Sequence, residues 1–430
     1  SIIMMDAHHK HSKAGGSTTV MVMLCTICAH ISYADRAFLS VVIISMTDEL
    51  GWTLADKAAV MGSFFPGYAT SQVFGVWLSS QYGAKKILVW AMCAWSLITV
   101  LTPLAATTSV KAMCITRFLL GVFEGVTFPV MYHFLSPWLS SDQRGKAVGS
   151  INAGSGSGSV LAFLISPMLG FYYGWRSTFY FYGVVGLLAA LLWHWLAIER
   201  VATIDASTNK QPTDAQANRG MCATVRVVLS MLKHPSVVSI IYCHICNCLG
   251  GFMMLTWLPT ILHDRFDTVG TGLWVSAIPC LGVMGGAVAG GLITDKLVDK
   301  GLSLTRTRRL VCVGGFGVSA VCIWSLATST SINVFLLLIL VERTFITGGS
   351  CGGYEAGKLD VASGPKVGLL QGVSNTCGAL AGATVQLTAY IVAVWGWEGI
   401  FYLLAFTYTS AALVFGSVFS SKRVFSDTTS

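Results

Sequence analysis

The sequence is poor in charge. Charged residues make up only 11% of its 430 residues, whereas hydrophobic residues make up 54%. A soluble domain typically carries about 25% charged residues. Apolar runs of about 20 residues, enough for one helical crossing of a bilayer, recur along the whole chain. This composition excludes a soluble protein with a single anchor and predicts a polytopic, all-α membrane protein embedded in the lipid bilayer.

Marks of glycosylation, disulfide, metal and enzyme chemistry are also scarce. No Asn-x-Ser/Thr sequon occurs, and of 13 cysteines only Cys222 lies in an evident polar loop. The other cysteines lie in apolar runs, where Cys packs as a small hydrophobe, so we expect no disulfide framework. The run Cys243–Cys248 stands alone without a second ligand pair, which favours close packing over a zinc site. No nucleophile, base and orienting group form a recognisable signature, so we expect no enzyme activity, no cofactor and no metal.

Apolar periodicity predicts twelve transmembrane helices in two sets of six. The spans lie at about 20–45, 58–81, 87–106, 112–135, 147–172, 178–198, 236–262, 271–294, 309–328, 332–356, 366–394 and 398–419. A polar stretch between the sixth and seventh spans has the composition of a linker. The expected parts are a disordered N-terminus (1–17), a six-helix bundle (18–198), a linker (199–233), a second six-helix bundle (234–420) and a tail (421–430).

The placement of basic residues predicts the orientation in the membrane. With twelve spans, both termini lie on one side. Of the 27 Lys and Arg residues, twenty fall on that side, four on the opposite side and three inside spans. Basic residues accumulate on the cytoplasmic side of membrane proteins. We therefore expect both termini and the linker to be cytoplasmic, in the plasma membrane or an organelle membrane. The net charge of +8 follows from this topology, and we expect no nucleic-acid partner.

An internal repeat relates the two halves. Gly174–Tyr180 reads GWRSTFY before the sixth span, and Gly396–Tyr402 reads GWEGIFY before the twelfth. Each segment follows a glycine-rich span. Parallel repeats of six spans, related by an axis along the membrane normal, occur in secondary transporters. The repeat therefore predicts two pseudo-symmetric bundles.

The fourth span carries two charges at membrane depth. Arg117 and Glu124 lie seven residues apart, which is two helical turns, so they share one face. Ionisable residues inside a spanning helix are rare and usually functional. Glu124 is a candidate proton carrier, or else a fixed counter-ion of Arg117, and the sequence leaves both hypotheses open.

The first span carries Asp35 next to Arg36. Neighbouring residues on a helix do not face each other, so these two are not simply a pair. The planar guanidinium of Arg36 can hold a carboxylate or phosphate through two hydrogen bonds. Its alternative role is to neutralise Glu124 or Asp35 inside the bundle. We favour anion binding, because a basic group at this depth needs an anionic partner.

Glycines four residues apart recur in several spans and predict close helix packing. Gly121 and Gly125 share a face of the fourth span, and Gly154 and Gly158 share a face of the fifth. In span ten, the adjacent pair Glu342-Arg343 indicates an ion pair or a gate, and the sequence does not decide between them.

Six motifs in this chain resemble those of the anion–cation symporter branch of the major facilitator superfamily. They are ISYADRAFLSVVI (31–43), GSFFPGY (62–68), RFLLGVFEGVTFP (117–129), the turn at 143–146, LTWLPT (255–260) and ITDKLVDKG (293–301). The branch includes sialin, the vesicular glutamate carriers and the sodium- or proton-coupled phosphate carriers. The resemblance implies the major facilitator fold, a substrate-binding role for Arg36 and a proton-coupling role for Glu124.

The chain also departs from this branch at particular positions. Vesicular glutamate carriers have an Arg at the position of Asn247 and a His at the position of Met61. The branch's usual Asn near the end of span ten is replaced around 355–357. The resemblance therefore implies an anion carrier without identifying the anion.

Taken together, these features predict a secondary active transporter of a small anion, inorganic phosphate or an organic carboxylate, that works by alternating access. A proton or sodium gradient would drive it, and a monomer would suffice. The alternative is a transporter-like subunit or receptor that no longer transports. Candidate substrate-binding residues are Arg36, Arg117, Tyr33, Phe65, Tyr68 and Asn247. Candidate coupling residues are Glu124 and Asp35, and candidate gating or structural residues are Arg144, Lys146 and Asp295.

Overall fold

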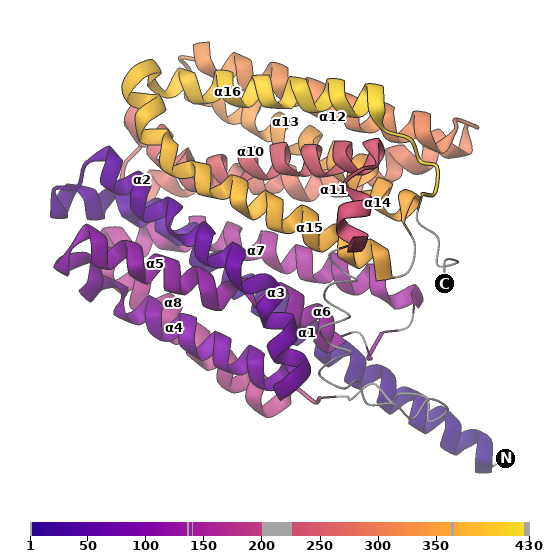
Figure 1. The fold of residues 1–430 in the computed structure, drawn as a ribbon. Coiled ribbons are helices and arrows are strands. Elements are labelled where there is room, and N and C mark those ends of the chain that lie inside the picture. The colour runs from indigo at the N-terminus through magenta and orange to yellow at the C-terminus, as the bar shows by residue number, and fades with distance from the viewer. Residues whose placement is uncertain (1, 136, 140, 200–225, 363–364, 425–430) are drawn as a thin grey trace. The chain divides into compact units, whose positions relative to one another are not determined.

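The computed structural model describes residues 2–135, 137–139, 141–199, 226–362 and 365–424 (Figure 1). For residues 2–17, 73, 76, 80, 141–146, 148, 271, 365, 366 and 368 it describes the backbone alone. Within these ranges the chain forms helices joined by short turns. The expectation of an all-α protein is therefore confirmed.

Contacts divide the chain into two compact units. Unit 1 comprises Ser1–Ala202 and Thr268–Ala277, and unit 2 comprises Thr203–Asp267 and Ile278–Ser430. The expected linker, 199–233, lies mostly outside the described residues. Thr268–Ala277 differs from the expected division, because its 3-10 helix packs against a helix of unit 1.

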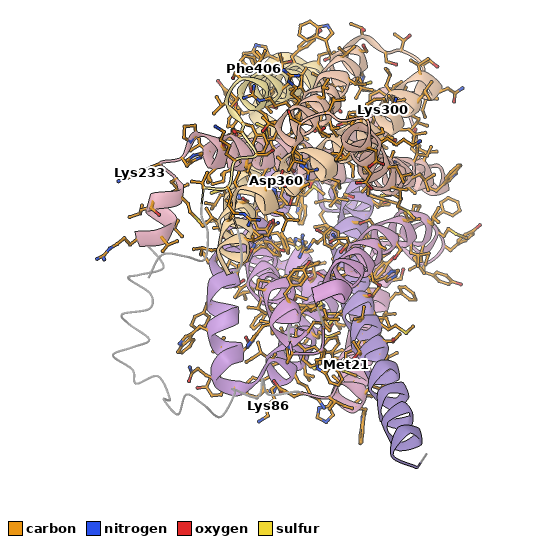
Figure 2. All side chains as sticks on the ribbon, turned by 90° about the vertical axis from the view of Figure 1, so that its right-hand side faces the viewer. Met21, Lys86, Lys233, Lys300, Asp360 and Phe406 are labelled. Atoms are coloured by element: carbon orange, nitrogen blue, oxygen red, sulfur yellow. The ribbon has the colours of Figure 1, made fainter. Side chains whose placement is uncertain are left out.

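Unit 1 contains the first eight α-helices and one 3-10 helix. They are α1 (Ile2–Leu50), α2 (Leu54–Gly62), α3 (Phe64–Tyr82), α4 (Ala84–Thr108), α5 (Val110–Gly125), α6 (Thr127–Leu135), α7 (Ser141–Tyr173), α8 (Trp175–Leu196) and η1 (Gly270–Ala277). Lys86, near the start of α4, projects from one end of this unit (Figure 2).

Unit 2 contains the remaining helices, including one π-helix. They are α10 (Pro235–Phe266), α11 (Ile278–Asp299), α12 (Leu304–Thr328), α13 (Ile332–Gly349), the π-helix η2 (Ser350–Glu355), α14 (Ala356–Val361), α15 (Pro365–Gly382), the 3-10 helix η3 (Ala383–Leu387) and α16 (Thr388–Val418). Residues 350–361 thus form two short helices at the end of α13 (Figure 1).

Ten stretches of the described residues are long and apolar enough to cross a membrane. One of them, Leu369–Val418, contains the predicted eleventh and twelfth spans together. The predicted second span, 58–81, corresponds to α2 and α3, which are separated at Ser63 and are not among the ten. The remaining predicted spans each match one stretch.

The N-terminal residues differ from the sequence expectation. We expected 1–17 to be disordered, but α1 begins at Ile2 and continues through the first span. Extending an existing helix adds one hydrogen bond for each residue fixed and avoids the cost of a new nucleus. A polar segment without Pro can therefore continue a membrane helix, although its composition is not that of a span.

The internal repeat places a similar backbone break in each unit. Gly174 lies between α7 and α8 with φ 77°, and Gly396 lies inside α16 with φ 65°. Glycine adopts positive φ at little steric cost, whereas other residues are strained there. The break at Gly396 separates the two predicted spans that α16 helps to form.

The Trp after each of these glycines makes an equivalent contact. Trp175 Nε1 donates to Glu49 Oε2 at 2.8 Å, and Trp397 Nε1 donates to Asp264 Oδ2 at 3.2 Å. Glu49 lies in the last turn of α1, and Asp264 lies in the last turn of α10. The two halves therefore repeat a hydrogen bond as well as a sequence motif, in accord with pseudo-symmetric bundles.

The glycine faces pack closely, as predicted. A methyl group at Gly154 would collide with the backbone of Thr26, and one at Gly158 would collide with the backbone of His30. These contacts join α7 to α1 inside unit 1. Gly121 of α5 meets the backbone of α3 at Phe64 in the same way. Gly121 therefore lets α3 approach the charged helix α5, while Gly154 and Gly158 let α1 approach α7.

Candidate functional site

Arg36 of α1 and Glu124 of α5 form an ion pair inside unit 1. Arg36 Nε donates to Glu124 Oε2 at 2.7 Å, and Ser32 Oγ donates to the same oxygen at 3.1 Å. The Glu124 side chain is 0% exposed and that of Arg36 is 7% exposed. Among the described residues, the other carboxylate oxygen, Glu124 Oε1, has no hydrogen-bond partner. This oxygen is available to a proton or another donor.

Aromatic rings surround the guanidinium of Arg36. Its Cζ lies 4.4 Å from the ring centroid of Tyr68, 4.9 Å from that of Tyr33 and 5.1 Å from that of Phe64. A cation over a ring is attracted by about 0.5–2 kcal/mol, more when water is excluded. The rings hold the guanidinium in place while leaving its planar edge to bind a carboxylate or phosphate.

Arg117 of α5 is buried, and within the described residues it forms no ion pair at salt-bridge distance. Its side chain lies over the ring of Phe64, with 5.1 Å between Cζ and the ring centroid. Its Nε has no hydrogen-bond partner among the described residues. Among the described residues, Glu124 is therefore hydrogen-bonded to Arg36 and not to Arg117, while Arg117 interacts electrostatically with both Glu124 and Asp35.

Asp35 points toward α4 and away from its neighbour Arg36. Thr99 Oγ1 donates to both carboxylate oxygens of Asp35, at 3.2 and 3.0 Å. Asp35 also interacts electrostatically with Glu124 and Arg117. Two carboxylates and two guanidiniums thus share one buried site, and their formal charges cancel.

Other predicted site residues lie elsewhere. Phe65 packs edge-on against Phe64, with ring centroids 5.5 Å apart. In unit 2, Asn247 donates to the hydroxyl of Tyr354 at 2.9 Å. Asp295 is exposed on α11. The side chains of two predicted gating residues lie outside the described residues, namely Arg144 and Lys146.

The pair Glu342-Arg343 is a buried ion pair in unit 2. The guanidinium contacts both carboxylate oxygens, and its NH2 group also donates to the hydroxyl of Tyr408 at 2.9 Å. Neighbours on a helix point in different directions, but a long Arg side chain can fold back. The pair joins α13 to α16 through Tyr408.

Sequence reasoning missed several residues of the site. Phe64 contacts both Arg36 and Arg117, whereas the candidate named from the sequence was its neighbour Phe65. Ser32 lies one turn before Arg36, so helical spacing could have indicated it. Thr99 gave no signal, because it comes from a different helix in an apolar run. Within the described residues, no three His, Cys, Asp or Glu side chains gather as they would around a metal ion.

The sequence has well-matched relatives. The profile described as Major Facilitator Superfamily matches residues 25–386. "Sodium-dependent phosphate transport protein 1, chloroplastic" of Arabidopsis thaliana is 30% identical, covering 94% of this chain and 80% of that protein. "Ascorbate transporter, chloroplastic" of Arabidopsis thaliana is 29% identical, covering 94% and 75%. "Voltage-gated purine nucleotide uniporter SLC17A9" of Homo sapiens is 29% identical, covering 87% and 85%.

Solved structures share the fold at low sequence identity. The crystal structure of a D-xylose-proton symporter matches with a TM-score of 0.70 and 15% identity, covering 94% of this chain and 98% of the other. An inward-facing bacterial homolog of the human lysosomal transporter Spinster also gives 0.70 and 15%, covering 93% and 98%. At such identities the likeness concerns the fold alone.

Proposed function

The chain belongs to the Major Facilitator Superfamily, and on that premise we propose that it is a proton-coupled carrier of a small anion that works by alternating access. It is a multi-pass membrane transporter and not an enzyme, and its relatives include phosphate, ascorbate and nucleotide carriers. The proposed roles are anion binding by Arg36 and Arg117 and proton binding by Glu124.

The observation that carries this proposal is the buried contact between Arg36 and Glu124. Taking ions out of water costs several kcal/mol each, so this site tolerates little net charge. With both carboxylates ionised, the formal charges of Asp35, Glu124, Arg36 and Arg117 cancel. A monovalent anion would leave the site negative, and a proton on Glu124 would restore neutrality. Anion and proton therefore favour each other's binding, which is the basis of symport.

The local geometry favours a proton over sodium as the coupling ion. A proton needs one free oxygen, and Glu124 Oε1 has no hydrogen-bond partner among the described residues. A sodium ion needs several oxygen ligands at once. Protonation would also weaken the attraction between Glu124 and Arg36, which would free the guanidinium to bind the anion.

The chemistry of Arg defines the substrate class. A guanidinium binds carboxylate or phosphate oxygens through paired, charge-assisted hydrogen bonds. Inorganic phosphate and a compact organic carboxylate both offer such oxygens. The rings of Tyr33 and Tyr68 would contact the non-ionic part of an organic substrate.

Uptake by purified protein in liposomes tests the proposal. The panel contains radiolabelled phosphate, ascorbate, glutamate and sialic acid, each offered under a proton gradient alone and under a sodium gradient alone. We expect the proton gradient to drive accumulation of at least one anion and the sodium gradient to drive none. Sodium-driven uptake would overturn the proton assignment.

The same experiment addresses the second candidate, a membrane subunit or receptor that no longer transports. Its support is the departures from the branch noted in the sequence, such as Asn247 where the vesicular glutamate carriers have an Arg. Saturable binding of an anion without uptake or exchange under either gradient would favour that candidate.

A further inference from the structure

A charged cluster in unit 2 lies where the tenth predicted span becomes irregular. Helix α13 passes into the π-helix Ser350–Glu355 before α14 begins. Short π-helical turns are rare and often occur at functional sites. A methyl group at Gly353 would come within 3.0 Å of Cys312 Cα in α12, so this turn is pressed against its neighbour. Arg308 also donates to the carbonyl oxygen of Gly352 at 3.1 Å. These contacts with α12 therefore hold the turn, and with it Glu355, in a fixed position.

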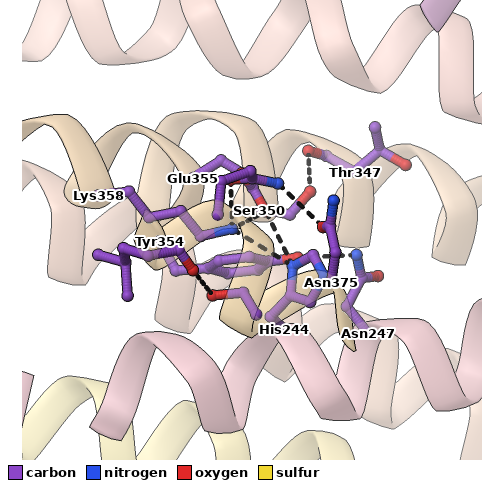
Figure 3. A network of polar contacts seen from close by, with 11 residues as sticks. His244, Asn247, Thr347, Ser350, Tyr354, Glu355, Lys358 and Asn375 are labelled. Atoms are coloured by element: carbon purple, nitrogen blue, oxygen red, sulfur yellow. Dashed lines mark hydrogen bonds and ion pairs between the residues drawn. The ribbon is translucent and has the colours of Figure 1, made fainter. Parts of the chain in front are cut away.

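His244 of α10 meets two opposite charges at one nitrogen. Its Nδ1 lies 3.0 Å from Glu355 Oε1 and 3.5 Å from Lys358 Nζ (Figure 3). Lys358 Nζ also donates to Glu355 Oε1 at 2.8 Å. Lys358 is 1% exposed and His244 is 8% exposed, whereas the Glu355 side chain is 31% exposed. Lys358 and His244 are thus buried, whereas the carboxylate of Glu355 is partly accessible.

The remaining polar contacts hold the three residues in place. Gln371 Oε1 accepts from Lys358 at 2.9 Å, and Gln371 Nε2 donates to Asn375 Oδ1 at 3.0 Å. The ring of Tyr354 lies edge-on to His244 and 5.5 Å from Lys358 Nζ. Figure 3 shows these side chains converging from α10, η2, α14 and α15.

Few other titratable or charged groups face this cluster. Among the described residues they are Cys248 of α10 and Cys351 and Tyr354 of η2. An ion pair between Arg308 of α12 and Asp360 of α14 also lies next to the π-helix. The polar groups that α15 contributes are neutral amides. The balance of charge at His244 is therefore set chiefly by Glu355 and Lys358.

This arrangement gives His244 two alternative hydrogen-bonding states. With a proton on Nδ1 the imidazole donates to Glu355, and without one it accepts from Lys358. A neutral imidazole leaves the cluster at zero formal charge, because Glu355 and Lys358 cancel. A second proton on the ring gives the cluster a charge of +1 and strengthens its contact with Glu355. A merely structural ion pair between Glu355 and Lys358 would need neither state.

We propose that His244, held between Glu355 and Lys358, is a second proton-binding site, located in unit 2, and that its protonation sets the pH dependence of transport. The transport part rests on the proposed function. The binding site itself does not, because protonation of His244 is measurable without any substrate.

The test is a titration of His244 by NMR. The full-length protein, labelled with ¹⁵N in its histidines, is placed in lipid nanodiscs. It has nine histidines, and the signal absent from His244→Gln is assigned to His244. We expect this signal to titrate between about pH 5 and 8, the range in which His charges change. An imidazole signal that stays constant over that range would overturn the proposal.

Two substitutions should shift the midpoint of the His244 titration in opposite directions. Glu355→Gln removes the acceptor of the protonated ring, so the midpoint should move to lower pH by about one unit or more. Lys358→Met removes the opposing cation, so the midpoint should move to higher pH. Shifts in the same direction, or no shift, would show that the two charges do not control His244.

Matched controls separate this effect from a general change in charge. Glu398→Gln and Lys296→Met make the same chemical changes elsewhere in unit 2, at a half-exposed side chain and at an exposed residue, and they should leave the midpoint unchanged. If Lys358→Met fails to fold, Glu355→Gln alone decides the sign: a midpoint that stays in place or moves to higher pH would overturn the proposal. In liposomes that take up phosphate or ascorbate, the pH optimum should move with the NMR midpoint. Opposed NMR shifts with an unmoved pH optimum would confine the site to binding and contradict its role in transport.

Discussion

Replacing Glu124 with Gln tests proton coupling directly, because the amide has the shape of a protonated carboxyl group but releases no proton. The amide oxygen can still accept from Arg36 and Ser32, which now donate to Glu124. Arg36 also keeps its contacts with three aromatic rings. Removing one partner of a buried pair outright costs roughly 3–5 kcal/mol, but the amide leaves the guanidinium hydrogen-bonded and still stacked on its rings, so the cost should be smaller. We therefore expect Glu124→Gln to fold and to bind the anion.

The expected loss is in accumulation against a gradient. If one proton accompanies one monovalent anion, a difference of one pH unit corresponds to about 1.4 kcal/mol. It should drive about tenfold accumulation of the anion in wild-type liposomes. Glu124→Gln should reach only the external concentration, while exchange of labelled for unlabelled anion continues. The assay measures binding, exchange and proton-driven uptake on the same purified preparation, with the anion identified by the liposome panel.

Glu398→Gln is the matched control, because it makes the same change in a side chain that is 44% exposed. It should accumulate anion as the wild type does. Tenfold accumulation by Glu124→Gln would refute the coupling role. Aggregation of Glu124→Gln, with normal behaviour of the control, would instead indicate that the pair with Arg36 is structural.

Three further predictions follow from the same geometry. Arg36→Lys keeps the charge but loses the planar guanidinium with its paired donors. Anion affinity in a binding assay should therefore fall roughly ten- to hundredfold, as expected for about 1.5–3 kcal/mol of charge-assisted hydrogen bonding. Wild-type affinity would show that Arg36 does not bind the anion. Gly154→Leu should lower the thermal stability and transport, because overpacking costs about 1–3 kcal/mol, whereas Gly156→Leu, whose Cβ would meet nothing within 4 Å, should do neither. A protease or an epitope label at Asn209 should be reached only from the cytoplasmic face or its equivalent, and access solely from the opposite face would reverse the orientation.

The sequence by itself determined the class of the protein and most of its spans, and it singled out two charges inside those spans. Span length, apolar composition and the scarcity of charge are properties of each segment alone. They predicted all-α crossings without knowledge of any partner. Arg36 and Glu124 stood out because an ionised side chain in an apolar run is costly wherever it points. The glycine spacing predicted close packing for a similar reason, since four residues return to the same helix face.

Only the tertiary structure decided which side chains meet. Glu124 and Arg117 share a face of α5, yet the partner of Glu124 is Arg36 of α1, 88 positions away in the chain. The carboxylate of Asp35 accepts hydrogen bonds from Thr99, and the ring of Phe64 lies against both guanidiniums.

The cluster of His244, Glu355 and Lys358 was likewise beyond sequence reasoning, because a π-helical turn alters the register on which helical spacing relies. Contacts between helices depend on the rotation of each helix about its own axis and on its height relative to its neighbours. Packing of the whole unit fixes both quantities, and no single segment encodes them.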